Sequence, residues 1–259
     1  MKAMILAAGL GTRLKPLTDL IPKPLVPVNN LPLIFYNLGL LKKFGIRDVV
    51  INLHHLGMQV KDLLGSGNKF GFRFSYSEEP AILGTGGGIM KAKSVLRNGP
   101  FLVLNSDIIV DVDLEKFLHF HGRQKSFASV VVQGGAKTKK YGVLYRRPDG
   151  SLASILEAPK QMGRYEKTFF TGIHLLDHRF FSLKIRQRKF CVIRDVYQPQ
   201  LARGVKLFAY RYDGIWFDLG TFADLKRVDS ALRSGRLKLS YGKFLDAFRN
   251  AIGERIDEL

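Results

Sequence analysis

The sequence predicts an α/β protein: a doubly wound, mostly parallel mixed sheet in a single domain. Over residues 1–112, apolar strand-like runs alternate with helix-like segments, a pattern typical of parallel sheets. After Val112 the pattern changes to short strand-like runs separated by turn signals such as Pro148-Asp149-Gly150. This pattern indicates a mixed sheet. No Ser/Pro-rich linker separates the halves, so we expect one continuous domain.

In the first half, each expected strand is an apolar or β-branched run followed by a helix-like segment. The first strand is the run from Ala3 to Ala8, which leads into a glycine-bearing loop. A helix follows Pro32 and stops at Gly45. The expected order is strand 3–8, helix 31–44, strand 48–53, helix 57–64, strand 72–78, helix 84–96 and strand 101–104.

In the second half, the expected order is helix 114–121, strands 128–133, 141–146, 152–157 and 169–176, helix 196–203, strand 206–211 and helix 222–235. Segment 241–259 reads as an amphipathic helix, because Phe244, Leu245, Phe248 and Ile252 recur at helical spacing. It is expected to pack either on the core or on a second subunit, as in a homodimer. The single domain is therefore divided into 1–112, 113–240 and 241–259.

The charge of the chain points to anionic partners. There are 41 Lys and Arg against 22 Asp and Glu, a net charge of +19. Nucleic acid, a lipid surface or phosphorylated small molecules are the classes it suggests. Hydrophobic residues make up 46%, which excludes a disordered chain. A single cysteine and apolar runs too short for a signal peptide or a membrane span lead us to expect a cytoplasmic protein.

The loop after the first strand carries the residues that suit phosphates. Segment 9–28, GLGTRLKPLTDLIPKPLVPV, combines glycines with Arg13 and Lys23. Glycines let backbone N–H groups approach phosphate oxygens, and the two cations neutralise them. Leu14 stands where a dinucleotide fingerprint needs its third glycine, and no Gly-Lys-Ser/Thr occurs for a P-loop. The segment therefore predicts triphosphate binding of another kind.

This segment closely resembles the signature of the sugar-1-phosphate nucleotidyltransferases, and the resemblance extends over most of the chain. It implies a Rossmann-like nucleotidyltransferase fold, with 1–112 as the NTP-binding half and 113–240 as the sugar-phosphate half. It also implies that Arg13 and Lys23 are catalytic, and that 83–88 with Glu79 is a base-binding loop. The nucleotide-binding residues implied are Ala8, Gly9, Gly11, Thr12, Arg13, Lys23, Glu79, Gly84 and Thr85. The alternative for 83–88 is a helix N-terminus whose glycines allow close packing.

Two aspartates are candidates to hold one Mg²⁺ ion. Asp107 closes an apolar strand, where an unpaired buried carboxylate is costly, so a cation partner is expected. Asp218 lies in Trp216-Phe217-Asp218-Leu219-Gly220-Thr221, which resembles the family's W-x-D-x-G-T element. Mg²⁺ suits a site with few carboxylates and substrate phosphates. Taken singly, each aspartate also fits a cap or a salt-bridge partner. Ser106, where the family usually has Gly, is a mild departure.

On the acceptor side, Tyr141-Gly142-Val143, Glu157 and segment 170–173 resemble three sugar-contacting elements of the family. The sugar-binding residues implied are Asn105, Gly142, Glu157, Thr171 and Gly172. The family's Glu-Lys-Pro is replaced here by Glu157-Ala158-Pro159-Lys160, so the cation expected on the sugar phosphate is absent from position 158. Lys160 and Arg194 are the two candidates to supply it. The basic run 184–194 is a solvated face or an anion-binding patch.

The resemblance implies an Mg²⁺-dependent transferase of nucleotide-sugar biosynthesis, which converts an NTP and a sugar 1-phosphate into an NDP-sugar and pyrophosphate for cell-wall or glycan precursors. A sugar 1-phosphate is nearly dianionic at neutral pH, so no general base is needed. Within the family the chain looks most like enzymes that uridylylate N-acetylmuramate 1-phosphate, and mannose-1-phosphate guanylyltransferases are the alternative. From another class, a non-catalytic polyanion-binding protein on the same fold remains open. No specific nucleic acid is expected as a partner.

Overall fold

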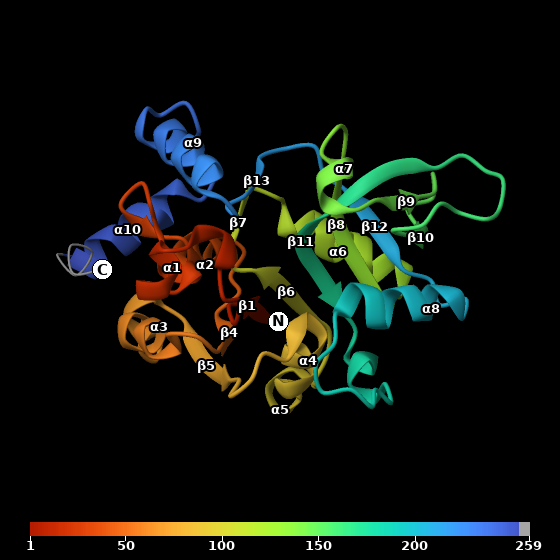
Figure 1. The fold of residues 1–259 in the computed structure, drawn as a ribbon, viewed down its shortest axis with the longest axis horizontal. Coiled ribbons are helices and arrows are strands. Elements are labelled where there is room, and N and C mark those ends of the chain that lie inside the picture. Colours follow the sequence, from red (N-terminus) through yellow and green to blue (C-terminus); the bar gives the residue numbers. More distant parts are fainter. Residues whose placement is uncertain (254–259) are drawn as a thin grey trace. The chain divides into compact units, whose positions relative to one another are not determined.

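The computed structural model describes residues 1–253, whose elements fall into two compact units that are described separately (Figure 1). Unit 2 comprises Lys2–Ile82, Leu104–Val112 and Gly214–Leu259, and unit 1 comprises Leu83–Val103 and Asp113–Asp213 together with Met1. Strand β6 (Phe101–Asn105) is divided between them. Part of the predicted C-terminal helix, residues 254–259, lies outside the described residues.

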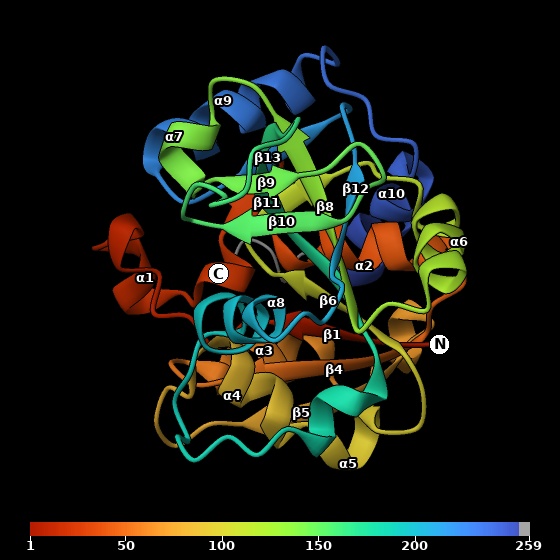
Figure 2. The same cartoon turned by 90° about the vertical axis from the view of Figure 1, so that its right-hand side faces the viewer.

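Unit 2 is built on three parallel strands, β1 (Lys2–Leu6), β4 (Asp48–Leu53) and β5 (Arg73–Glu78), which pair side by side in that order (Figure 2). Ala3, Met4 and Ile5 are fully buried, as in a strand covered on both faces. The other elements of unit 2 are α1 (Leu17–Leu20), β2 (Pro27–Val28), β3 (Leu31–Pro32), α2 (Ile34–Lys43), α3 (Gly57–Leu64), β7 (Ile108–Val110), β13 (Trp216–Asp218), α9 (Phe222–Arg233) and α10 (Gly242–Ile252).

Helix α10 packs on the core of unit 2, which was one of the two expected arrangements. Leu245, Phe248 and Ile252 are buried, as their spacing predicts. The ring of Phe248 lies 5.1 Å from that of Phe35 in α2, measured between centroids, and such aromatic contacts add to the burial of apolar area. The hydroxyl of Tyr241, just before α10, donates to Val110 O at 3.0 Å. Helix α10 therefore packs against helix α2.

Unit 1 contains a mixed group of strands. β11 (Glu166–Leu176) pairs antiparallel with β8 (Ala128–Gly134) and β9 (Leu144–Arg146), while β12 (Phe208–Arg211) runs parallel to β8. β10 (Leu152–Ile155) pairs with β9. The helices of unit 1 are α4 (Gly84–Lys91), α5 (Lys93–Leu96), α6 (Leu114–Gln124), α7 (Thr138–Tyr141) and α8 (Gln198–Ala202), and α8 follows a π-helix over Val192–Tyr197.

The predicted α/β class, with a mostly parallel mixed sheet, is confirmed, and several element boundaries are corrected. Expected strand 141–146 begins only at Leu144, because the preceding residues form α7 and Gly142 adopts a φ of +81°. Expected helix 84–96 is interrupted at Ala92. The β2–β3 hairpin, β7 and β13 were not predicted. The division into an NTP-binding half and a sugar-phosphate half stays a prediction. No helix within residues 1–253 has the length and apolar character needed to cross a bilayer.

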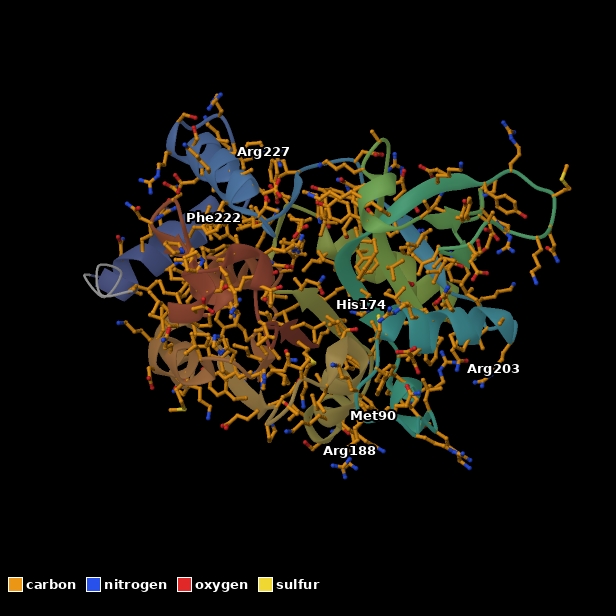
Figure 3. All side chains as sticks on the ribbon, viewed as in Figure 1. Met90, His174, Arg188, Arg203, Phe222 and Arg227 are labelled. Carbon is orange, nitrogen blue, oxygen red and sulfur yellow. The ribbon has the colours of Figure 1, made fainter. Side chains whose placement is uncertain are left out.

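His174, in strand β11 of unit 1, is fully buried (labelled in Figure 3). Its Nδ1 lies 2.5 Å from the hydroxyl of Tyr197, and Nε2 has no hydrogen-bond partner among the described residues. Burial lowers the pKa of His174 from 6.5 to about 3. The folded protein therefore keeps this ring neutral under conditions in which the unfolded chain protonates it.

This burial predicts a loss of stability in acid. Below pH 6.5 the unfolded state binds a proton that the folded state does not. The free energy of unfolding therefore decreases as the pH is lowered. From pH 7 to pH 5, His174 alone should account for about 2 kcal/mol of that fall. In urea denaturation, the His174→Gln variant should show a shallower pH dependence than the parent by this amount, whereas exposed His119→Gln should not. Identical pH dependence in parent and H174Q would contradict the assignment.

Candidate active site

The predicted phosphate loop follows directly from β1 in unit 2. At Gly9 no atom lies within 4 Å of the place a Cβ would take, so the backbone there is open to a ligand. Gly11 adopts a φ of +64°, and its carbonyl accepts hydrogen bonds from Leu14 N at 2.8 Å and from the Thr18 hydroxyl at 2.9 Å. A Cβ at Gly11 would lie 2.8 Å from Thr18 Cγ2. The sequence GLGT therefore folds into a tight turn that exposes its backbone.

Lys23 and Asp107, 84 residues apart in sequence, form an ion pair in unit 2. Lys23 Nζ lies 2.5 Å from Asp107 Oδ2, and the two side chains are 10% and 25% exposed. Charge-assisted bonds of this kind are stronger when largely shielded from water. The predicted need of Asp107 for a cation partner is thus met within the chain by Lys23.

Asp107 and Asp218 come together because their strands are neighbours. β13 pairs antiparallel with β7, with Asp218 opposite Ile108, the residue after Asp107. Leu219 N donates to Asp107 O at 2.9 Å, which extends the pairing past Asp218. Two carboxylates that are 111 positions apart in sequence therefore lie at the same end of a two-stranded ribbon.

The donor set fits a hard divalent cation that takes its remaining ligands from a substrate. Within residues 1–253, no group of three or more His, Cys, Asp or Glu side chains is arranged to hold a metal. A pair of carboxylates suits Mg²⁺, which commonly binds one or two carboxylates together with water and phosphate oxygens. Lys23 is the cation that Asp107 contacts within the described residues, and Mg²⁺ binding at this position stays a prediction.

Arg13 lies against the segment that carries Asp218. A Cβ at Gly220 would stand 2.5 Å from Arg13 Nη2 and 2.7 Å from Arg13 Cζ, so the guanidinium rests directly on the glycine. Thr221 then caps α9, because its hydroxyl accepts from Asp224 N at 3.2 Å. In the W-x-D-x-G-T element, Asp218 thus supplies a carboxylate, Gly220 leaves room for the Arg13 guanidinium, and Thr221 caps helix α9.

A buried amide links the start of the phosphate loop to Glu79. Asn52, at 3% exposure, accepts from Ala7 N at 2.8 Å through Oδ1 and donates through Nδ2 to Glu79 Oε1 at 2.7 Å. Glu79 is itself 3% exposed. Its side chain is therefore held in the interior, and the residue's carbonyl contacts His54 Nδ1 at 2.6 Å.

Three glycines of segment 83–88 are closely packed in unit 1, as the alternative to a base-binding loop expects, while base binding by this segment stays a prediction. Cβ atoms at Gly84, Gly86 and Gly87 would lie 2.3–2.6 Å from backbone or ring atoms of Phe190 and Arg188. Gly86 N donates to Phe190 O at 3.0 Å, and the Thr85 hydroxyl accepts from Val192 N at 3.0 Å. Segment 184–190, which we call the basic strap, is thereby anchored through Phe190 on α4.

The acceptor elements meet in unit 1. Leu156 N donates to Val143 O at 2.7 Å, which sets the Gly142 turn beside Glu157. The Thr171 hydroxyl donates to Val131 O at 2.8 Å, and Thr171 and Gly172 fall where the pairing of β11 with β8 shifts register. Asn105, also predicted to bind sugar, ends β6 and belongs to unit 2 instead.

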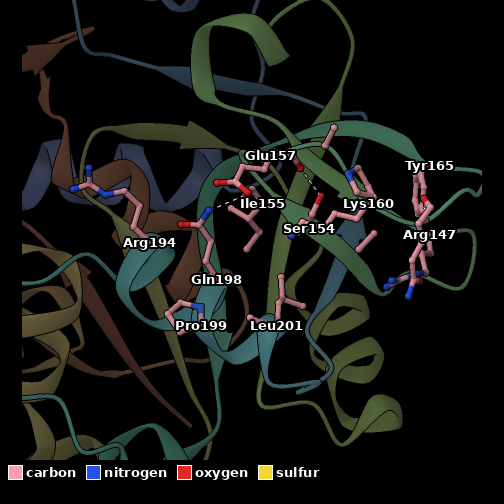
Figure 4. A pocket seen from close by; sticks show the side chains of 15 residues that line it. Arg147, Ser154, Ile155, Glu157, Lys160, Tyr165, Arg194, Gln198, Pro199 and Leu201 are labelled. Atoms are coloured by element: carbon pink, nitrogen blue, oxygen red, sulfur yellow. Dashed lines mark hydrogen bonds between the residues drawn. The ribbon is translucent and has the colours of Figure 1, made fainter.

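Both candidates to replace the cation missing at Ala158 line the same cavity as Glu157. Lys160 and Arg194 stand with Glu157 and Ala158 around a cavity of unit 1 (Figure 4).

The structure therefore gathers the predicted residues into two sets, one in each unit. Arg13, Lys23, Asp107, Asp218 and the loop from Ala8 to Thr12 lie in unit 2 with Glu79, whereas Gly84 and Thr85 lie in unit 1 with Gly142, Glu157, Thr171 and Gly172. Sequence reasoning missed Asn52 and the role of Gly220. An asparagine inside an apolar strand was a signal for the first, because a buried amide needs partners.

Comparisons with known proteins identify the class. The family model of the nucleotidyl transferases matches residues 2–235. The chain is 34% identical over 228 residues to a probable mannose-1-phosphate guanylyltransferase of Arabidopsis thaliana, covering 85% of this chain and 62% of that one. It is 34% identical over 234 residues to the N-acetylmuramate alpha-1-phosphate uridylyltransferase of Neisseria meningitidis, covering 89% and 97%.

A crystal structure from Bacillus anthracis, assigned as a glucose-1-phosphate thymidylyltransferase, superposes with a TM-score of 0.78 at 30% identity, covering 93% of this chain and 99% of that one. The match confirms the Rossmann-like nucleotidyltransferase fold. The protein belongs to the nucleotidyl transferase family, an enzyme family. It spans about three fifths of the length of the guanylyltransferases it matches and nearly all of the uridylyltransferase.

Proposed function

We propose that this protein transfers a nucleotidyl group from an NTP to a sugar 1-phosphate in an Mg²⁺-dependent reaction, giving an NDP-sugar and pyrophosphate. The observation that supports this most is the arrangement in unit 2: the ion pair of Lys23 with Asp107, the adjacent Asp218 strand, and Arg13 on Gly220 of that same element. Two cations and two carboxylates converge on a glycine-bearing loop, as transfer between phosphates requires.

In the reaction, an oxygen of the acceptor's phosphate forms a bond to the α-phosphorus of the NTP. The bond from that phosphorus to the oxygen bridging to the β-phosphate breaks, and pyrophosphate leaves. The acceptor phosphate is largely dianionic near neutral pH, because its second pKa is about 6. No side chain has to remove a proton, so the task of the protein is alignment and charge stabilisation.

Each predicted residue then has a role. Arg13, Lys23 and the backbone amides from Ala8 to Thr12 bind the triphosphate and stabilise the charge that develops on the leaving pyrophosphate. Asp107 and Asp218 would hold Mg²⁺, which when bound neutralises charge on phosphate oxygens. Glu79, Gly84 and Thr85 belong to the base-binding side, and Asn105, Gly142, Glu157, Thr171 and Gly172 to the sugar-binding side.

For substrates we propose UTP with N-acetylmuramate 1-phosphate or a related hexose 1-phosphate, a cytoplasmic step towards cell-wall or glycan precursors. The support is that the relative of that name is matched over 97% of its length. Equal identity to a guanylyltransferase supports GTP with mannose 1-phosphate as the second candidate.

The experiment is a release assay for pyrophosphate, with purified protein, Mg²⁺, each of UTP, GTP, CTP and dTTP, and a panel of sugar 1-phosphates. UTP with N-acetylmuramate 1-phosphate should give the highest rate. A thermal-shift series would rank the bases independently, since ligand at about 100 Kd adds roughly 2.7 kcal/mol of stability. Absence of pyrophosphate release with every pair would refute the proposal and favour the polyanion-binding alternative.

A further inference from the structure

Most of the positive charge of the protein lies in unit 1. This unit carries 23 of the 41 Lys and Arg residues but only 8 of the 22 Asp and Glu residues, and so holds most of the net charge of +19. Binding of the triphosphate accounts for little of this excess, because Arg13 and Lys23, which are proposed to bind it, belong to unit 2. The charge of unit 1 therefore points to a further anionic partner.

Two neighbouring segments of unit 1 contain basic residues and no acidic ones. They are 83–103, which includes α4 and α5, and 178–190, which includes the basic strap. Lys93 Nζ donates to Phe181 O at 3.3 Å, and Gly86 N donates to Phe190 O at 3.0 Å, so the second segment is held on the first near both of its ends. The helices and the strap lie side by side in both views of the fold (Figures 1 and 2). The surface that they share, which we call the basic face, has as its exposed cations Lys93, Arg97, Lys184, Arg186, Arg188 and Lys189.

The charges of the basic face are not neutralised by carboxylates of the protein. Within residues 1–253, none of its six cations forms an ion pair, and the hydrogen bond of Lys93 goes to a neutral carbonyl. The acidic residues just outside segment 178–190 have other partners. Asp177 pairs with Arg179 at 2.6 Å, and Asp195 accepts from Cys191 N at 2.6 Å. The six cations are therefore available to an anionic partner.

The residues between these cations favour a lipid surface over nucleic acid. Leu183 and Ile185 are half-buried and alternate with Lys184 and Arg186, so apolar and cationic side chains are interleaved, as at membrane interfaces. The basic strap contains no helix or strand, and α5 has only four residues, so neither resembles the helix or ribbon that enters a duplex groove. Single-stranded nucleic acid stacks on exposed aromatic rings, whereas the aromatic residues of the two segments are all buried: Phe101, Phe180, Phe181 and Phe190.

We propose that the basic face docks the protein on a membrane surface rich in anionic lipids. Its cations bind the phosphates of the lipid headgroups, and Leu183 and Ile185 contact the boundary between headgroups and acyl chains. The attraction is electrostatic and falls off within a Debye length, so the docking is reversible and sensitive to salt. It is independent of the proposed transfer reaction, whose phosphate loop and carboxylates lie in unit 2.

The test is flotation of the whole protein, without nucleotide or Mg²⁺, with two kinds of vesicle. One contains phosphatidylglycerol and phosphatidylcholine in equal parts, and the other contains phosphatidylcholine alone. At about 0.1 M salt the protein should bind the first kind and not the second. Salt at about 1 M should release it, because the Debye length shortens from about 10 Å to about 3 Å.

Two variants of equal net charge separate the basic face from the charge of the whole protein. The strap variant combines K184Q, R186Q, R188Q and K189Q. It should bind the anionic vesicles about 100-fold more weakly, because each cation near such a surface contributes about fivefold. The control variant replaces four exposed cations elsewhere in unit 1, by Arg123→Gln, Arg164→Gln, Arg203→Gln and Lys206→Gln. It should lose about fivefold or less, and thermal unfolding should show that both variants are folded (Arg188 and Arg203 are labelled in Figure 3).

Ile185→Ser leaves the charge unchanged and removes an apolar contact, so it should weaken vesicle binding about fivefold. Absence of vesicle binding by the parent would overturn the inference. Equal losses in the strap and control variants would do so too, because net charge and not this face would then bind the lipid. A third contrary result is binding of duplex DNA or RNA, at the same salt, that is tighter than vesicle binding, lost in the strap variant and unaffected by I185S. That result would assign the basic face to nucleic acid.

Discussion

Asp107→Ala is expected to lower the rate of pyrophosphate release by about 1,000-fold, the largest effect of any single change in unit 2. The variant loses one of the two carboxylates that would hold Mg²⁺. It also leaves the ammonium of Lys23, whose side chain is 10% exposed, without the partner it has at 2.5 Å. Burying an unpaired charge is costly, so the unfolding free energy should fall as well.

The Asp107→Asn variant separates the two effects. An amide oxygen can still accept a hydrogen bond from Lys23, so stability should recover in part, while turnover should stay as low as in D107A because the negative charge is absent. Asp62→Ala, at an exposed aspartate of α3, is the control. An unchanged rate in D107A would refute the metal assignment. Stronger polyanion binding together with no turnover in the parent would favour the non-catalytic alternative.

Gly220→Ala is expected to lower kcat about 100-fold with little change in stability. The added Cβ would stand 2.5 Å from Arg13 Nη2, so the guanidinium has to move away. The guanidinium is the flexible end of the Arg13 side chain, so it can move at a small cost in folding free energy. A displacement of about 1 Å of a group that acts on phosphates can nevertheless lower the rate about 100-fold.

A double-mutant cycle tests the coupling. Arg13→Ala should lose about as much activity as G220A, and adding G220A to R13A should cost little more, because both changes remove the same interaction. Gly242→Ala is the matched control, since no atom lies within 4 Å of a Cβ there. If the losses of activity caused by G220A and R13A multiply in the double variant, Gly220 affects the rate by some route other than making room for Arg13.

Hydropathy patterns predicted the regular elements well where burial alone decides them. Both ends of β1, β4 and α9 lie within two residues of their expected positions. Buried strands and amphipathic helices have strong hydropathy patterns in the sequence. The ribbon of β7 and β13 was missed: each strand has three residues, and what aligns them is a pairing across more than a hundred positions. Short strands of this kind carry no local pattern.

The candidate site shows the same division. Arg13, Lys23, Asp107 and Asp218 were indicated by their motifs, and the structure brings them into one unit. That Lys23 would pair with Asp107, or that Arg13 would rest on Gly220, depends on the tertiary path of the chain. For Gly84 and Gly86 the sequence left two interpretations open, a ligand-binding loop or close packing. Their close packing is visible only from the position of Phe190 in the folded chain.

Because the basic strap is anchored on α4, its local opening can be followed by limited proteolysis. Lys184, Arg186, Arg188 and Lys189 are exposed, and each is a site for trypsin (Arg188 is labelled in Figure 3). Phe190, which follows them, is 4% exposed and hydrogen-bonded to α4. Cleavage after Arg188 or Lys189 requires this anchored backbone to leave its place, so its rate reports how often Phe190 detaches from α4. The time course of limited proteolysis therefore reads out the local opening of this segment without any added label.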